Sequence, residues 1–202
     1  GYEVYSVMKK LPEHTWFAVQ WSDNYDKQVS SSVPQVYWSE KKPCVLYESK
    51  YCYLWTKNFG ARVQGYNSDM TRTVVIGKAD ADVKKVYNTV LAAQKAALDV
   101  LAEGVNCRAV DAAARDLIEN AGYHGCFGHG LGHGVGLLIH EAPRFSPKAP
   151  ADSVLTRGHV VTVEPGIYLE GKYGCRIEDM ICLRPDGTVY DFTKSPKELI
   201  EL

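Results

Sequence analysis

The alternation of apolar and polar positions predicts two helices in the middle of the chain, each with one buried face. From 79 to 101, apolar residues recur at three- and four-residue intervals, and Gly104 follows as a stop signal. A second such pattern runs from 108 to 120, with Asn106 placed to cap its first turn. Both helices are most simply elements that cover a core, and we assign them no chemistry.

Short segments with β-branched or alternating residues predict strands before and after these helices. The segments are 59–66, 68–77, 160–168, 175–183 and 189–192. Three carboxylates, Asp69, Glu164 and Glu178, stand on or at the end of these strands. Burying an ionised carboxylate is costly unless a metal ion or another cation meets it. A turn cap or an arginine partner would explain any one of them, but three in one chain are less ordinary.

A glycine-rich stretch, 128–141, lies between the second helix and the last strands and holds three of the six histidines. Glycine at every second position disfavours a helix by about 1 kcal/mol per residue, so the backbone is free to run extended or to turn sharply. If the stretch is extended, His129 and His133 lie roughly 13 Å apart at about 3.3 Å per residue. They could not both ligate one metal ion. We therefore predict one ligand, with the other histidines, including His140, beside it or facing a substrate; a glycine-rich loop with incidental histidines is the alternative.

Residues 1–57 give the weakest pattern in the chain. They are rich in Tyr, Trp and Ser and contain strand-like pieces at 16–21, 45–47 and 51–55, without a convincing helix. We treat 1–57 as an atypical, strand-rich N-terminal segment that is part of, or appended to, a domain formed by 58–202.

Composition excludes several classes of function. The 23 Lys and Arg nearly balance the 24 Asp and Glu, so nothing attracts nucleic acid or an anionic membrane electrostatically. No run approaches the roughly 18 apolar residues of a membrane span, and the first residues do not resemble a signal peptide. The six cysteines form no Cys-x-x-Cys pair, which is typical of reduced thiols in a cytoplasmic protein.

The remaining candidates form a metal-binding set: Asp69, His133, Glu164 and Glu178. Three carboxylates and an imidazole that arrive from separate strands suit a pair of hard or borderline divalent ions. Separate satisfaction of each side chain by arginine or backbone donors is the alternative.

The order and spacing of these motifs resemble the pita-bread metallopeptidases, specifically the Xaa-Pro aminopeptidase and prolidase branch. The similar segments are Asn-Phe-Gly-Ala with Ser-Asp-Met-Thr-Arg-Thr (58–73), His-Gly-Leu-Gly-His-Gly-Val-Gly with His-Glu (129–141), Val-Glu-Pro-Gly-Ile-Tyr (163–168) and Arg-Ile-Glu-Asp (176–179). The resemblance covers about 58–198. It implies an α+β pita-bread fold, in which helices cover a curved antiparallel sheet.

The resemblance also implies a role for each motif residue at the metal centre. Asp69 and Glu178 would bridge two divalent ions (manganese, cobalt or zinc), and His133 and Glu164 would complete one of them. Glu164 would in addition act as general base for a bridging water. Arg176 would contact the carboxylates from outside the ligand set.

On the substrate side, the resemblance implies that His129 and His140 position the peptide and stabilise the tetrahedral intermediate. The implied reaction is hydrolysis of the bond between an N-terminal residue and a following proline. The substrate is then a peptide with proline at its second position, and a homodimer is compatible with the family.

Two departures from the family pattern bear on activity. Asn58 stands where the family has its first metal-binding aspartate, and an amide offers one neutral oxygen instead of a bidentate anion. The ion that depends on position 58 is therefore expected to bind more weakly. Residues 1–57 do not resemble the family, and Gln35 stands in the faintly similar context of an expected substrate-side histidine.

Three functional hypotheses follow. The first, which we favour, is a metallopeptidase with a one-metal or impaired two-metal site. The second is a catalytically inactive pita-bread module that binds peptides or proteins. The third is metal-free chemistry of the creatinase kind, against which the four intact ligands argue.

Overall fold

The computed structural model describes residues 47–48, 52–170 and 172–202. The strand-like pieces expected at 16–21 and 45–46, and Gln35, lie outside the described residues. The division of the chain at residue 58 therefore stays a prediction.

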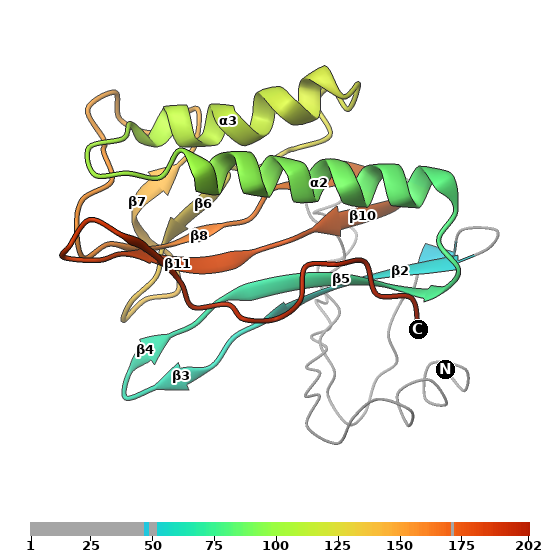
Figure 1. Ribbon diagram of the computed structural model, residues 1–202, viewed down its shortest axis with the longest axis horizontal. Helices are drawn as coiled ribbons and strands as arrows, with labels where there is room; N and C mark the ends of the chain where they lie inside the picture. The colour runs from blue at the N-terminus through green and yellow to red at the C-terminus, as the bar shows by residue number, and fades with distance from the viewer. Residues whose placement is uncertain (1–46, 49–51, 171) are drawn as a thin grey trace.

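Two helices, α2 (Ala81–Asp99) and α3 (Cys107–Asn120), lie side by side over the sheets (Figure 1). α2 is two residues shorter at each end than predicted. It begins after Asp80, because the Asp80 side chain caps the first turn by accepting from the Val83 amide at 2.8 Å. Asn106 caps α3 as predicted, accepting from the Arg108 amide at 2.9 Å. Among the described residues, neither helix has the length and apolar character needed to cross a membrane.

In the part of the chain that the structure describes, the strands form four antiparallel sheets. The three-stranded sheet consists of β1 (Tyr47–Glu48), β2 (Cys52–Phe59) and β5 (Met70–Gly77). The five-stranded sheet has the order β12 (Val189–Asp191), β11 (Asp179–Leu183), β8 (Val160–Val163), β6 (Gly132–Gly134) and β7 (Glu141–Phe145). Two further pairs are β3 (Arg62–Val63) with β4 (Tyr66–Asn67), and β9 (Gly166–Leu169) with β10 (Tyr173–Arg176).

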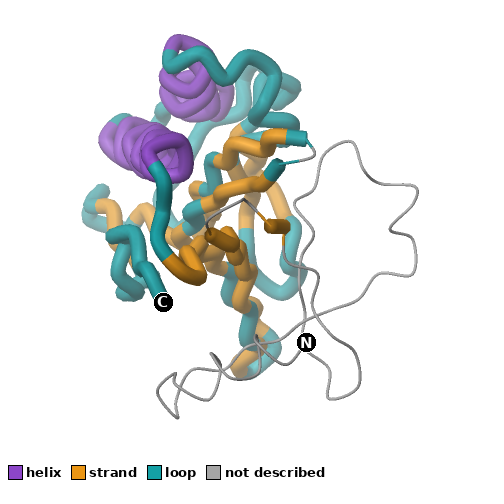
Figure 2. Tube along the Cα trace, turned by 90° about the vertical axis from the view of Figure 1, so that its right-hand side faces the viewer, coloured by secondary structure: helices purple, strands orange, loops and turns teal. Residues whose placement is uncertain are grey.

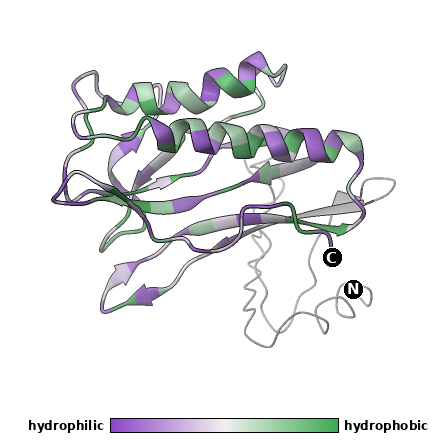
Figure 3. Ribbon diagram, viewed as in Figure 1, coloured by the Kyte–Doolittle hydropathy of each residue, from purple (hydrophilic) through white to green (hydrophobic). Residues whose placement is uncertain are grey.

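The core lies between the helices and the sheets, which Figure 2 shows as separate layers. Hydrophobic positions of both helices alternate with hydrophilic ones along the chain (Figure 3), so each helix has one apolar face. Val90 of α2 and Ile118 of α3 are fully buried, as are Val161 and Ile181 of the five-stranded sheet. Each such side chain contributes about 1.5–3 kcal/mol on burial, and together they fix the helices over the sheet.

The expected strand 175–183 is interrupted in the structure. β10 ends at Arg176 and β11 begins at Asp179, so Glu178 lies in a break and not in mid-strand. The reason is that its backbone pairs with Thr71 of β5: the Glu178 amide donates to the Thr71 carbonyl at 3.0 Å. This bridge connects the three-stranded sheet to the five-stranded sheet at the position where the carboxylates meet.

The glycines of 128–136 allow close contact between strands. A Cβ on Gly132 would lie 2.0 Å from the Thr162 carbonyl oxygen, and one on Gly134 would lie 2.2 Å from that of Ala142. β6 therefore lies against its neighbours at a distance that no other residue permits. Only 132–134 is a strand, and the chain then bends, which returns His140 to the side of His133.

Gly132→Ala is accordingly expected to cost about 1–3 kcal/mol of unfolding free energy, because the new methyl group displaces β6 from β8. Chemical denaturation measures the loss. Gly104→Ala is an informative comparison: nothing lies within 4 Å of its Cβ, so only the backbone penalty of its φ of 79° applies. An unchanged stability of the Gly132 variant would contradict the close contact.

Candidate metal centre

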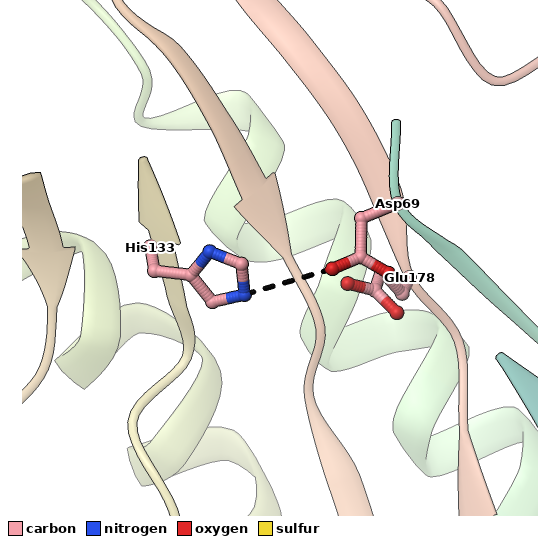
Figure 4. A group of neighbouring side chains, drawn as sticks. All are labelled: Asp69, His133 and Glu178. Carbon is pink, nitrogen blue, oxygen red and sulfur yellow. Dashed lines mark ion pairs between the residues drawn. The ribbon is translucent and has the colours of Figure 1, made fainter. Parts of the chain in front are cut away.

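Asp69, His133 and Glu178 converge from three separate parts of the chain. Asp69 precedes β5, His133 is the middle residue of β6, and Glu178 lies between β10 and β11. Their ligand atoms all lie within 4.8 Å of one another, and all three side chains are buried (Figure 4). Within the described residues, this is the group of His, Cys, Asp and Glu side chains whose geometry suits a metal ion.

Glu164, which follows β8, joins the group through His133. The His133 Nε2 atom lies 3.3 Å from Glu164 Oε1 and 3.8 Å from Asp69 Oδ2. Its Nδ1 atom lies 3.0 Å from the Gly134 carbonyl oxygen and donates to it, which fixes the ring with Nε2 toward the carboxylates. This is the orientation of a histidine that ligates a metal through Nε2.

The electrostatics of the metal-free site favour an added cation. Desolvation, followed by repulsion from Glu164 and Asp69, raises the pKa of Glu178 well above its usual range. Desolvation lowers the pKa of His133, but the hydrogen bonds with Glu164 and Gly134 and the charges of Glu164 and Asp69 together outweigh it, so the net shift is upward. A proton on His133 thus compensates the carboxylates, as a bound metal ion would do more strongly.

The two oxygens of Glu178 have unequal partners. Oε2 accepts from the Thr71 hydroxyl and from the Asn58 amide at 3.4 Å. Oε1 is buried and has no hydrogen-bond partner. An unpaired buried acceptor costs about 1–3 kcal/mol, and more when charged. A divalent ion with carboxylate and imidazole ligands fits this atom, so the residues present suit the metal that their chemistry implies.

Arg176 lies beside the carboxylates without displacing them from the centre. Its Nε atom is 4.0 Å from an oxygen of Glu164 and 4.0 Å from one of Glu178, and it donates to the Thr71 hydroxyl at 3.0 Å. Through Thr71, Arg176 orients Oε2 of Glu178. The guanidinium also contributes a fixed positive charge to a buried acidic site.

The other two histidines lie near the cluster. His140 packs edge-on against His133, with ring centroids 4.3 Å apart. The Nδ1 atom of His129 lies 2.8 Å from the Gly130 carbonyl oxygen and donates to it, which leaves Nε2 to accept from the Tyr168 hydroxyl at 2.6 Å. Burial lowers the pKa of both histidines, so each is neutral near pH 7. Neutral rings can accept or donate hydrogen bonds without adding charge.

Comparison with known proteins identifies the fold and the family. The model of metallopeptidase family M24 matches residues 20–185, which is most of the chain. The chain belongs to metallopeptidase family M24. The same motifs that carry the metal-binding set lie inside the matched range.

Two of the M24 relatives that the chain resembles are named as dipeptidases. The chain is 44% identical over 143 residues to an Xaa-Pro dipeptidase of Pyrococcus horikoshii, covering 71% of this chain and 40% of that protein. It is 45% identical over 136 residues to a probable dipeptidase PepE of Mycobacterium tuberculosis, covering 67% of this chain and 36% of that protein. The chain thus spans about two fifths of the length of these relatives.

Solved M24 structures have the same pita-bread fold. An Xaa-Pro dipeptidase from Bacillus anthracis superposes with a TM-score of 0.69 at 48% identity, covering 73% of this chain and 41% of that one. A prolidase from Thermococcus sibiricus superposes with a TM-score of 0.70 at 44% identity, covering 75% of this chain and 40% of that one. The predicted α+β fold and the resemblance to the prolidase branch are therefore confirmed.

Several supporting residues of this M24 site were missed from the sequence. Tyr168 contacts His129, and Thr71 donates to Glu178. The sequence pattern assigned no role to Tyr168 or to Thr71. Asp111 and Arg115 of α3 anchor the start of the glycine-rich stretch: Asp111 accepts from the Leu131 amide at 2.9 Å, and Arg115 donates to the His129 carbonyl at 2.7 Å. A signal existed, because Asp111 falls within the apolar stripe of that helix.

Proposed function

We propose that this chain is a metal-dependent peptidase that hydrolyses the bond between an N-terminal residue and proline. The observation that carries the proposal is the buried Asp69–His133–Glu178 cluster, in which one oxygen of Glu178 lacks any protein partner. Asp69, His133, Glu164 and Glu178 would hold the metal, which we propose to be manganese, cobalt or zinc. When bound, the metal would lower the pKa of a water molecule and polarise the scissile carbonyl.

Glu164 is proposed as the general base. Desolvation raises the pKa of its carboxyl, but the hydrogen bond with His133 and the charges of Arg176 and the neighbouring histidines together outweigh it, so the net shift is downward. The carboxylate is therefore ionised at neutral pH and able to accept a proton from the attacking water. The same group could then deliver that proton to the proline nitrogen as the bond breaks.

His129 and His140 are proposed to contact the substrate. His129 is held by Gly130 on one ring nitrogen and by Tyr168 on the other, so its ring is fixed in place. His140 lies against the ligand His133 and is more exposed. Both would position the peptide. His140 would also stabilise the tetrahedral intermediate by donating to the developing oxyanion, whereas the single N–H of neutral His129 is already donated to the Gly130 carbonyl.

The experiment that tests the proposal combines metal loading with a peptide assay. The full chain, incubated with Mn²⁺, Co²⁺ or Zn²⁺, is expected to hydrolyse an Xaa-Pro dipeptide and to spare the matched Xaa-Ala dipeptide. Metal uptake and peptide binding without hydrolysis would instead support the inactive binding module. Failure to take up any metal would contradict both the enzyme and its proposed centre.

Metal removal is expected to destabilise the protein. A ligand present at about 100 times its Kd contributes about 2.7 kcal/mol of unfolding free energy. For a domain of 150–250 residues this corresponds to a fall in Tm of roughly 5–11 °C when a chelator is added. Differential scanning calorimetry with and without chelator measures the shift. A Tm that is insensitive to both chelator and added metal would show that the folded chain holds no metal at these residues.

A further inference from the structure

Asn58 points its amide at the carboxylates of the metal centre. It lies in β2 opposite Thr71 of β5, and its Nδ2 atom donates to Asp69 Oδ1 at 2.9 Å. The same nitrogen donates to Glu178 Oε2 at 3.4 Å. A single amide nitrogen thus lies between one oxygen from each of two buried carboxylates.

The four carboxylate oxygens divide into two sets. Asp69 Oδ1 and Glu178 Oε2 face Asn58, and the Thr71 hydroxyl also donates to Glu178 Oε2. Asp69 Oδ2 lies 3.8 Å from His133 Nε2, and Glu178 Oε1 has no hydrogen-bond partner. The first set is satisfied by protein donors, whereas the second is free to ligate an ion together with His133 and Glu164.

The orientation of the Asn58 amide follows from these neighbours. With its oxygen turned inward, the amide would place a third acceptor against two carboxylate oxygens, which is repulsive unless a cation lies among them. With its NH₂ group inward, both oxygens receive a hydrogen bond.

The charges of the site agree with one ion better than with two. When all three are ionised as ligands, Asp69, Glu164 and Glu178 would carry three negative charges, and Arg176 adds one positive charge 4.0 Å from Glu164 and Glu178. One dication then brings the group to neutrality, whereas two dications would leave two uncompensated positive charges in a buried site. Uncompensated charge is costly when both ligands and ion are shielded from water.

We infer that this centre binds a single divalent ion per chain, on the His133 side, and that the Asn58 amide takes the place of a second cation between Asp69 and Glu178. The inference rests on the metal centre of the proposed function but concerns stoichiometry and not turnover. It also makes position 58 the determinant of nuclearity: a carboxylate there would add the negative charge and the acceptor oxygens that a second ion needs.

Mn²⁺ titration of the full chain tests the inference. Calorimetry and elemental analysis are expected to give one ion per wild-type chain, with the electron paramagnetic resonance spectrum of isolated Mn²⁺. Asn58→Asp is expected to take up a second ion and to give a spin-coupled pair. Asn88→Asp, on the exposed face of α2, adds the same charge elsewhere and should stay at one ion.

The outcomes separate this inference from the proposed function. Two ions in the wild type would overturn the single-ion centre while leaving the peptidase proposal intact. One ion in Asn58→Asp would also overturn it, because the amide would not then be what excludes the second ion. No ion in the wild type would contradict the proposed metal centre itself. If Asn58→Asp does not fold, the wild-type stoichiometry and spectrum still decide.

Discussion

Glu178→Gln is expected to abolish tight metal binding and peptide hydrolysis while raising the Tm of the metal-free protein. Glu178 is fully buried, and desolvation together with Glu164 and Asp69 holds its pKa well above the usual range. Glutamine has the same shape but no charge, so it removes the repulsion. It also replaces the unpaired Oε1 atom, either with a donor facing the other carboxylates or with a neutral acceptor.

The two effects differ in size. Loss of an outer-sphere partner lowers metal affinity by about 10–100-fold, and loss of a ligand should exceed that. An unsatisfied buried acceptor costs about 1–3 kcal/mol, which corresponds to a Tm increase of roughly 2–12 °C for the metal-free variant of a chain this size. Calorimetry in chelator measures the stability, and Mn²⁺ titration measures the affinity.

Glu103→Gln is the matched control, since Glu103 forms an exposed ion pair with Arg157 away from the centre. It should change neither metal affinity nor metal-free stability appreciably. If Glu178→Gln instead lowered the stability of the metal-free protein, the carboxylate would be a structural partner of Thr71 and Asn58. Burying Glu178 would then stabilise the metal-free fold, instead of lowering its stability in order to provide a metal ligand.

Local signals in the sequence were sufficient for the elements that carry the site. The capping residue Asn106 and the helical periodicity located α3, and the glycine alternation indicated a backbone free to run extended and to turn, as it does on either side of His133. The spacing of His129 and His133 excluded a joint ligand role, and the structure's cluster contains only His133 of the two. These features depend on neighbours in the chain, so they can be seen without the fold.

Contacts between distant segments could not be predicted in the same way. Glu178 was expected in mid-strand because its neighbours alternate like a strand, whereas its backbone pairs with Thr71, more than one hundred residues earlier. The donation from Asn58 to Asp69 and Glu178 likewise requires the register of β2 on β5. The sequence pattern identifies the residues that are unusual for their position. Which residues they contact depends on strand register and on how the sheets meet.

Arg72→Ala is expected to cause a large loss of stability. The Arg72 side chain is buried and forms an ion pair with Asp179 at 2.8 Å. Its guanidinium also donates to four backbone carbonyl oxygens, those of Thr71, Glu178, Ser195 and Pro196. Breaking a buried ion pair by removing one partner costs about 3–5 kcal/mol, or roughly 6–20 °C in Tm here.

Two comparisons separate the charge of Arg72 from its geometry. Arg72→Lys keeps the positive charge but cannot reach several acceptors with one planar group, so its stability should lie between wild type and Arg72→Ala. Lys78→Ala removes an exposed cation that pairs with Glu201 and should leave the Tm nearly unchanged. Equal stability of the Arg72→Lys variant and the wild type would show that charge alone matters at this position.

Arg72 should also affect the metal centre, which a purely structural residue would not. Its guanidinium donates to the carbonyls of both Thr71 and Glu178, the pair whose bridge connects β5 to β11. Loosening that bridge lets Asp69 and Glu178 separate, so Mn²⁺ affinity of the folded Arg72→Lys variant should fall even at temperatures well below its Tm. If its stability fell but its metal affinity did not, the Thr71–Glu178 bridge would hold the ligands without help from Arg72. The guanidinium would then serve only to attach the chain around Ser195 and Pro196 to the sheet.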